Sequence, residues 1–314
     1  MRACVLCGIS SKTMNLDIID RRFGMVFAIL SAVLFGSMPL FTKIAYAYGC
    51  NAYTVAFGRF LVGALGSGIV VTILPDISFR VTRPEFHKLA GLSVFYAATP
   101  VLLYEAYRGI STGLATTLHF TYPVIVMMIG TVAFHNRLHA RQIICLFICV
   151  AGIACFYKPG QTESASGMAL AVASGFTYAL YILFLGRSGL HRLHVMVVTF
   201  WISLLSATEI GLAALVGGKL TLFIPWQGWL AIVGLGLFAT VLALALFQLG
   251  VFLCGDVKAS LLSTFEPLTG VILGVLVFHE ALTPRTVAGI ALILLSTLLL
   301  VIDRSPCLSG GESR

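Results

Sequence analysis

Two long apolar runs near the C-terminus, residues 268–278 and 287–302, constrain the fold more than any other part of the sequence. A short polar connector that contains Pro284 joins the two runs. With its neighbours, each run is long enough to cross a bilayer as an α-helix. Proline is well tolerated in the first turn of a helix, because the N–H that it lacks would have no partner there. Residues 265–302 are therefore predicted to form a helical hairpin in lipid.

A second copy of this hairpin lies about 144 residues upstream, and one fixed offset aligns the two copies without a gap. The matched pairs include Tyr122-Pro123 with Glu266-Pro267, Gly130 with Gly274, Leu138 with Leu282, and Arg141 with Arg285. A weaker match at nearly the same offset pairs Gly24-Met25 with Gly167-Met168 and Ser31 with Ser174. The chain is therefore predicted to contain two copies of one unit.

The composition indicates that lipid surrounds most of the chain. Hydrophobic residues make up 59% of the sequence, charged residues make up 10%, and the mean hydropathy is +1.01. A chain of this length cannot hide so much apolar surface in one core. The net charge of +8 comes from basic residues scattered among short loops, which argues against a nucleic-acid partner.

The sequence offers no catalytic or metal-binding motif. It has no phosphate-binding glycine loop with a lysine, no HExxH and no GxSxG. The cysteines have no metal-ligand spacing, and Cys145, Cys149, Cys155 and Cys254 lie in apolar runs, where a thiol usually acts as a small hydrophobic group. We therefore expect no enzyme activity, no cofactor and no metal.

Hydropathy and turn residues predict an all-α integral membrane protein with ten transmembrane helices. The expected helices cover residues 23–47, 52–74, 89–108, 112–134, 140–157, 167–186, 194–216, 226–253, 257–278 and 285–302. They group into a first repeat at 23–158 and a second at 167–302. The polar linker 159–166 separates the repeats, and residues 1–22 and 303–314 are expected to be tails.

Five helices per repeat is an odd number, so the second repeat is predicted to insert upside down relative to the first. With both termini on one side of the membrane, most loop lysines and arginines fall on that side, Lys258 among them. Cytoplasmic loops carry such an excess of positive charge. Both tails are therefore predicted to be cytoplasmic, in a multi-pass protein of the plasma (bacterial inner) membrane.

The hairpin residues also carry a resemblance to a known family. Residues 260–294 resemble the C-terminal hairpin of an EamA repeat, with the Glu266-Pro267 to Glu280 spacing as the most specific part, and residues 113–157 resemble the N-terminal copy. Two such repeats are similar to the EamA family of the drug/metabolite transporter superfamily. The resemblance implies a secondary carrier of small metabolites, often an exporter of amino acids or related compounds. One departure is Asn136, where the family usually has a glutamate.

Polar residues inside the apolar runs are the candidate binding or coupling residues, because each is costly in lipid unless it is paired or faces a cavity. Glu266 either faces a cavity, where it binds a cation or carries a proton, or hydrogen-bonds a neighbouring helix. His119 either reports or transfers a proton, or is satisfied by a neighbouring backbone carbonyl. Arg59 either reaches the interface or pairs with a carboxylate such as Glu105, and Glu105 is also three residues from Arg108. The full set of candidates is Glu266, His119, Tyr122, Tyr104, Tyr178, Tyr181, Gln248, Trp201, Arg59 and Glu105.

These features predict a secondary transporter of small organic metabolites that works by alternating access. Amino-acid-like or related polar compounds and net export are preferred, with either proton coupling or exchange as the driving force. A metabolite uptake carrier and a flippase for a lipid-linked substrate are the alternatives. The expected partners are a small-molecule substrate and membrane lipids, with a homodimer left open.

Overall fold

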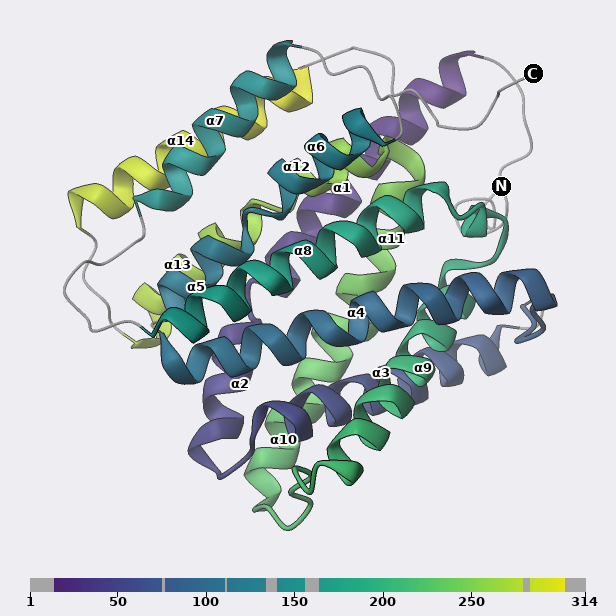
Figure 1. Cartoon of the computed structure of the whole chain (residues 1–314). Coiled ribbons are helices and arrows are strands. Elements are labelled where there is room, and N and C mark those ends of the chain that lie inside the picture. The colour runs from purple at the N-terminus through teal and green to yellow at the C-terminus, as the bar shows by residue number, and fades with distance from the viewer. Residues whose placement is uncertain are drawn as a thin grey trace.

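The computed structural model describes residues 14–74, 77–110, 112–133, 140–155, 164–278 and 283–302, and this part of the chain is helical apart from short connections (Figure 1). The first repeat contains α1 (Met14–Phe35), α2 (Met38–Ala47), α3 (Ala52–Ile73), α4 (Arg83–Gly109), α5 (Thr112–His119), α6 (Tyr122–Val132) and α7 (Ala140–Ala154). The second contains α8 (Ala165–Arg187), η1 (Leu190–Arg192), α9 (Val195–Val216), α10 (Trp226–Leu235), η2 (Gly236–Leu242), α11 (Ala243–Cys254), α12 (Asp256–Leu262), α13 (Phe265–Phe278) and α14 (Pro284–Ile302). These segments account for the ten predicted helices, because several of those helices are split.

Six stretches of the described chain are long and apolar enough to cross a membrane. They are Arg22–Ala47, Ala52–Ile73, Arg83–Gly109, Ala165–Arg187, Val195–Val216 and Trp226–Cys254. The remaining predicted helices contain shorter apolar segments, of which Tyr122–Val132 is one. The prediction of an all-α membrane protein with two repeats of helices is confirmed.

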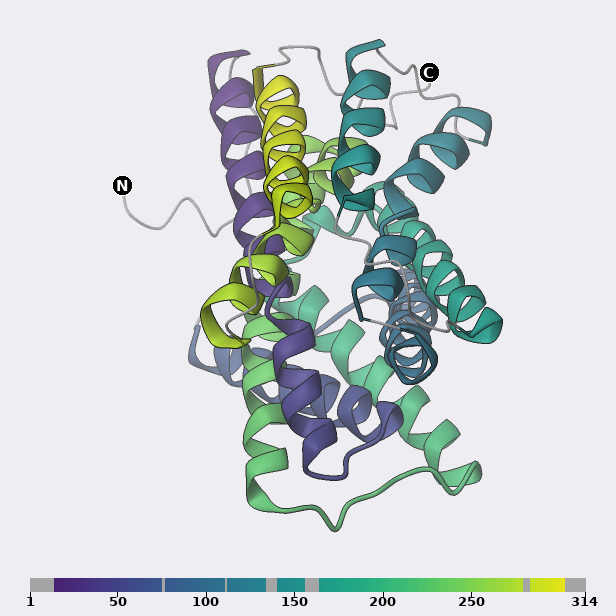
Figure 2. The same ribbon diagram turned by 90° about the vertical axis from the view of Figure 1, so that its left-hand side faces the viewer.

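Three of the predicted helices are broken, and each break lies just before a proline. The first helix breaks at residues 36–37 before Pro39, and α2 continues beyond it in a new direction (Figure 2). The fourth breaks at 120–121 before Pro123, and the ninth at 263–264 before Pro267. Proline lacks an N–H and its ring clashes with the preceding turn, so a new helix starts at each site. The predictions of single helices at 112–134 and 257–278 were wrong in this respect.

The eighth predicted helix is continuous but changes its winding at its centre. Residues of η2 (Gly236–Leu242) form a π-helix between α10 and α11. Such segments are rare and frequently occur at functional sites. Pro100, in contrast, lies inside α4 without breaking that helix.

Two predicted boundaries need correction. The third helix begins at Arg83, whereas the sequence predicted its start at residue 89. Thr82 and Glu85 form a capping box there, in which each side chain bonds the other's backbone N–H. The first helix begins at Met14, inside the predicted tail.

The packing of the two repeats follows a two-fold pattern. The first and third helices of one repeat pack against the third and first helices of the other, as α1 with α11 and α4 with α8. The second helices, α3 and α9, pack against each other. The fifth helices, α7 and α14, lie side by side at one edge of the molecule (Figure 1). The core therefore lies between the repeats, formed by helices from both.

Some predicted features lie outside the described residues, or differ from expectation. The connectors with Asn136 and Glu280 are outside the described residues, as is most of the linker. Lys258, which the charge count placed in a cytoplasmic loop, is buried in α12 with 6% of its surface exposed.

Candidate functional site

Arg59 occupies the centre of the molecule, where elements of both repeats meet. Its side chain is 2% exposed and extends from α3. Nη1 donates to the Tyr104 hydroxyl at 3.0 Å and to the Met38 sulfur at 3.3 Å. Nη2 donates to the Tyr96 hydroxyl at 3.1 Å, and Nε donates to the Thr240 hydroxyl at 3.1 Å. The guanidinium therefore ties α3 to α2, α4 and η2.

This geometry excludes the two predictions made for Arg59. A side chain that reached the interface would be exposed, whereas this one is fully enclosed. The proposed pair with Glu105 is absent, since Glu105 bonds Arg108 at 3.2 Å instead. Arg59 turns inward because tyrosine hydroxyls from α4 are within its reach.

Tyr96, which contacts this guanidinium, also packs against aromatic rings of the second repeat. The ring centroid of Tyr96 on α4 lies 4.6 Å from that of Tyr181 and 6.5 Å from that of Tyr178, both on α8. The Tyr181 hydroxyl accepts a hydrogen bond from Gln248 Nε2 at 3.3 Å, and Gln248 Oε1 accepts one from Thr199 at 3.1 Å. The structure thus brings five of the candidates into one buried cluster: Arg59, Tyr104, Tyr178, Tyr181 and Gln248.

His119 and Tyr122 join this cluster from the broken fourth helix. Their rings lie 5.4 Å apart, and Tyr178 contacts both, at 5.6 Å from His119 and 4.8 Å from Tyr122. His119 Nδ1 lies 2.8 Å from the hydroxyl of Ser174 on α8. Because that hydroxyl donates its proton to Ala171 O, it accepts from Nδ1–H, which fixes the imidazole tautomer. The histidine is therefore satisfied by a side-chain hydroxyl of a neighbouring helix, whereas the predicted alternative to proton transfer was a backbone carbonyl.

Glu266 lies at the start of α13, directly after the break at 263–264. A side chain on Gly36 would meet Glu266 O at 2.5 Å, so this start is packed against the break that ends α1. Glu266 is partly exposed, in contrast to the buried residues around it. Its carboxylate is near enough to Arg59 to interact electrostatically, yet the described residues form no ion pair between them.

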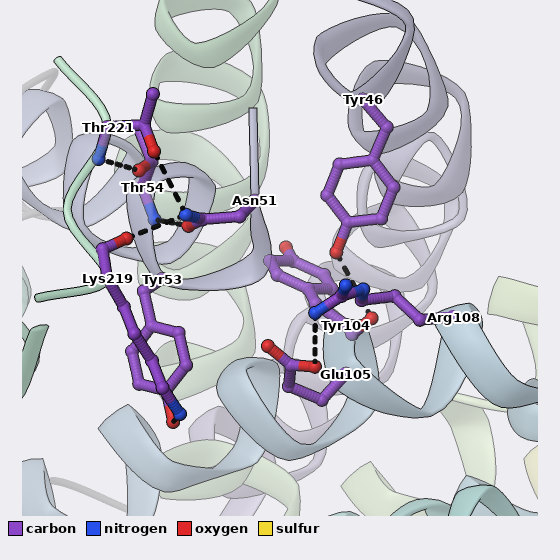
Figure 3. A network of polar contacts seen from close by, with 9 residues as sticks. All are labelled: Tyr46, Asn51, Tyr53, Thr54, Tyr104, Glu105, Arg108, Lys219 and Thr221. Atoms are coloured by element: carbon purple, nitrogen blue, oxygen red, sulfur yellow. Dashed lines mark hydrogen bonds and ion pairs between the residues drawn. The ribbon is translucent and has the colours of Figure 1, made fainter. Parts of the chain in front are cut away.

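The C-terminal end of α4 carries a separate polar group (Figure 3). Arg108 donates to Glu105 on the same helix, as the spacing of three residues predicted. The Tyr46 hydroxyl donates to Tyr104 O at 3.1 Å. Glu105 therefore belongs to the end of α4, whereas Tyr104 directs its hydroxyl inward to Arg59.

Trp201 lies apart from the buried cluster. Its indole N–H donates to Phe79 O at 3.0 Å, and its ring packs on Phe86 and Phe200. It lines a pocket formed by the connection between α3 and α4 and by the first turn of α4. The candidate Trp201 is therefore not part of the buried cluster that contains Tyr178, Tyr181 and Gln248.

Several members of the cluster were not predicted from the sequence, among them Met38, Thr240 and Ser174. Met38, Thr240 and Ser174 are small or apolar residues without a charge, so nothing in the sequence distinguishes them from ordinary helix residues. One signal was present for Ser174, which matches Ser31 in the repeat. Ser31 also reaches across the repeats, because its hydroxyl donates to Ala243 O at 2.7 Å.

The cluster can bind a small molecule through charge, hydroxyl groups and aromatic faces. It offers one cation, one carboxylate, an imidazole and several phenols beside three helix breaks. Among the described residues no group of His, Cys, Asp and Glu is arranged to hold a metal ion.

Comparison with known proteins supports the interpretation of the fold. The model of the EamA-like transporter family matches this chain twice, over residues 22–158 and 165–302. An uncharacterized transporter of Archaeoglobus fulgidus is 27% identical over 278 residues, which cover 88% of this chain and 96% of the relative. An uncharacterized transporter of Synechocystis is 28% identical over 243 residues, or 74% of this chain and 72% of the relative.

One solved structure has the same fold. A crystal structure aligns over 88% of this chain and 96% of its own length, with a TM-score of 0.73 and 17% sequence identity. At that identity the likeness extends to the fold alone.

Proposed function

Because this chain belongs to the EamA-like transporter family, a family of transporters rather than enzymes, we propose that it moves a small organic metabolite through the buried cluster between its two repeats. The observation that carries this proposal is the position of the cluster. Arg59, His119, Tyr122, Tyr178 and Glu266 come from both repeats and lie beside broken helices.

Broken helices suit a transport site for a physical reason. The backbone groups freed at a break can bind a substrate, and helices that end near the membrane centre can move relative to their neighbours. Alternating access then requires the two repeats to rock about the cluster. The odd number of helices per repeat predicts that the repeats have inverted orientations. Similar structures would then open and close access to the cluster from each side of the membrane.

The chemistry of the cluster favours an amino-acid-like or related polar compound with an apolar part. Arg59 and Glu266 supply opposite charges, and the tyrosine faces supply apolar surface. Net export from the cytoplasm, cytoplasmic termini and residence in the plasma (bacterial inner) membrane are parts of the same proposal.

Glu266 is the proposed coupling residue. It is a partly exposed carboxylate at the start of α13, where loss or gain of a proton alters the charge next to Arg59. A substrate and a proton can then compete for, or cooperate at, the same cluster. The Glu105 carboxylate, which bonds Arg108 at the end of α4, has no such position.

The first experiment is a thermal-shift screen of the detergent-purified protein. Amino acids, nucleosides, sugars, organic acids, amines and lipid-linked compounds are tested, because a ligand of the folded carrier raises its melting temperature in a dose-dependent way. A shift by a small metabolite supports the proposal. A shift by lipid-linked compounds alone would replace it with a flippase.

Coupling is tested with the compound found in that screen. We expect Glu266→Gln to abolish gradient-driven accumulation in proteoliposomes and to retain exchange of labelled for unlabelled compound. Glu105→Gln, the matched control, should change neither. Unchanged accumulation in Glu266→Gln would contradict the coupling role. Comparison of efflux from preloaded cells with uptake by intact cells tests the direction.

A further inference from the structure

Arg59 is a buried cation whose direct partners are all uncharged. Its hydrogen bonds go to two phenols, one alcohol and one thioether, and its guanidinium carbon lies 4.9 Å from the Phe60 ring centroid. No carboxylate of the described residues is within ion-pair distance of it. A buried charge is expensive in such surroundings unless an opposite charge is in contact with it. Within the described residues the guanidinium therefore has no anion in direct contact, although the Glu266 carboxylate is near enough to interact electrostatically.

The hydrogen bonds around Arg59 also indicate that an acceptor is missing from its immediate surroundings. A guanidinium has five N–H donors, and four of them are directed at Tyr96, Tyr104, Met38 and Thr240. The three hydroxyl oxygens accept from the guanidinium, so their own protons remain for another acceptor. Within the described residues none of these three hydroxyls donates a hydrogen bond. The cluster thus has a surplus of donors and a shortage of acceptors.

A carboxylate has the properties that the cluster lacks. It carries one negative charge and two oxygens that accept several hydrogen bonds, and an arginine fork binds it well. Phenols that already accept from a guanidinium are polarised, which makes their O–H groups better donors to that carboxylate. Glu266 does not fill this role, because its carboxylate remains out of contact with Arg59.

We propose that Arg59, with Tyr96 and Tyr104, binds the carboxylate of the transported compound. This inference rests on the proposed function and narrows the substrate class to small carboxylates, either organic acids or zwitterions. The tyrosine faces of α8 lie beside the apolar part of the compound. Arg59 also joins α2, α3, α4 and η2, so carboxylate binding acts on elements of both repeats at once.

Matched pairs of compounds test this proposal directly. Amino acids and small monocarboxylic acids are each compared with the corresponding amide and methyl ester, which keep the shape and remove the negative charge. Dissociation constants are measured with the purified wild-type protein by thermal shift and calorimetry. We expect the acids to bind and the amides and esters to bind at least about tenfold more weakly.

Two variants of Arg59 assign the effect to this residue. Arg59→Gln should lose the preference for the acid over its amide, and Arg59→Lys, which keeps the charge but not the fork, should retain part of it. Arg108→Gln serves as the control, because Arg108 is an exposed arginine that bonds Glu105. If Arg59→Gln does not fold, the double variant Tyr96→Phe with Tyr104→Phe keeps the charge and removes two donors. It should weaken binding of the acid several-fold.

The outcomes separate this proposal from the function on which it rests. Compounds that are bound and transported without any preference for acid over amide would overturn the carboxylate site and leave the carrier intact. A preference that survives in folded Arg59→Gln would overturn the role of Arg59. Binding of no compound in any class would overturn both proposals.

Discussion

A methyl group added at Gly63 should separate the two repeats at their centre. Gly63 lies one turn after Arg59 on α3, against the π-helical segment η2. A Cβ atom there would lie 2.3 Å from Thr240 Cγ2, 2.9 Å from Thr240 Cβ and 3.2 Å from Ser203 Oγ. Ordinary contacts between carbon atoms are about 3.5–4.0 Å long, so something must move by more than about 1 Å.

The side chain of Thr240 cannot easily give way. It is β-branched and therefore stiff about χ1, and its hydroxyl holds Arg59 Nε. Helices α3 and η2 must instead move apart, which is overpacking at a cost of about 1–3 kcal/mol. Replacing glycine in a helix also gives back up to about 1 kcal/mol of helix propensity. The net destabilisation expected for Gly63→Ala is therefore about 0–3 kcal/mol, accompanied by a weaker Arg59–Thr240 contact.

The measurement compares Gly63→Ala with Gly91→Ala by thermal unfolding of the detergent-purified proteins. Gly91 lies inside α4, and a Cβ atom there meets nothing within 4 Å. Gly91→Ala should therefore raise the melting temperature, whereas Gly63→Ala should lower it or leave it unchanged. The interpretation of close packing between the repeats is refuted if both variants raise the melting temperature equally.

Two further substitutions test a contact within the cluster and a contact between the end of α8 and the start of α12. Ser174→Ala removes the acceptor of the His119 Nδ1–H. Because a buried donor then loses its partner, the protein should be destabilised by about 1–3 kcal/mol in thermal unfolding. An unchanged melting temperature would show that this hydrogen bond does not contribute to stability. Asp256→Asn keeps an oxygen for the Val257 N–H and removes the charge that pairs with the partly buried Arg187. A double-mutant cycle with Arg187→Gln should give a coupling of about 1 kcal/mol or more, and additive effects would show that the pair is not stabilising.

Much of the architecture could be predicted from the sequence because its signals are local. The lengths of the apolar runs predicted the helices, and the fixed offset between matching residues predicted the two repeats. Pro123 and Pro267 are visible in the sequence, yet proline alone does not decide whether a helix breaks, since Pro100 lies inside the unbroken α4. Whether neighbouring helices support the freed backbone decides the outcome, and that is a property of the fold.

The candidate site was less predictable, for a reason that follows from the helices themselves. A helix that is apolar on all sides has no strong stripe to show which face meets protein and which meets lipid. Arg59 could therefore have pointed to the interface, and Trp201 could have joined the tyrosines. Their actual positions depend on the Tyr96 and Tyr104 hydroxyls and on Phe79 O, which the tertiary structure brings to them.

The central claim is that one binding cluster between the two repeats serves both sides of the membrane in turn. Counterflow tests it most directly, with wild-type protein in liposomes preloaded with the unlabelled compound from the binding screen. The labelled compound should enter faster and accumulate transiently, because a loaded site returns more readily than an empty one, and Arg59→Gln should lose this stimulation. Alternating access at this cluster would be contradicted if the rate of entry of the labelled compound did not depend on the internal compound and rose linearly with the external concentration.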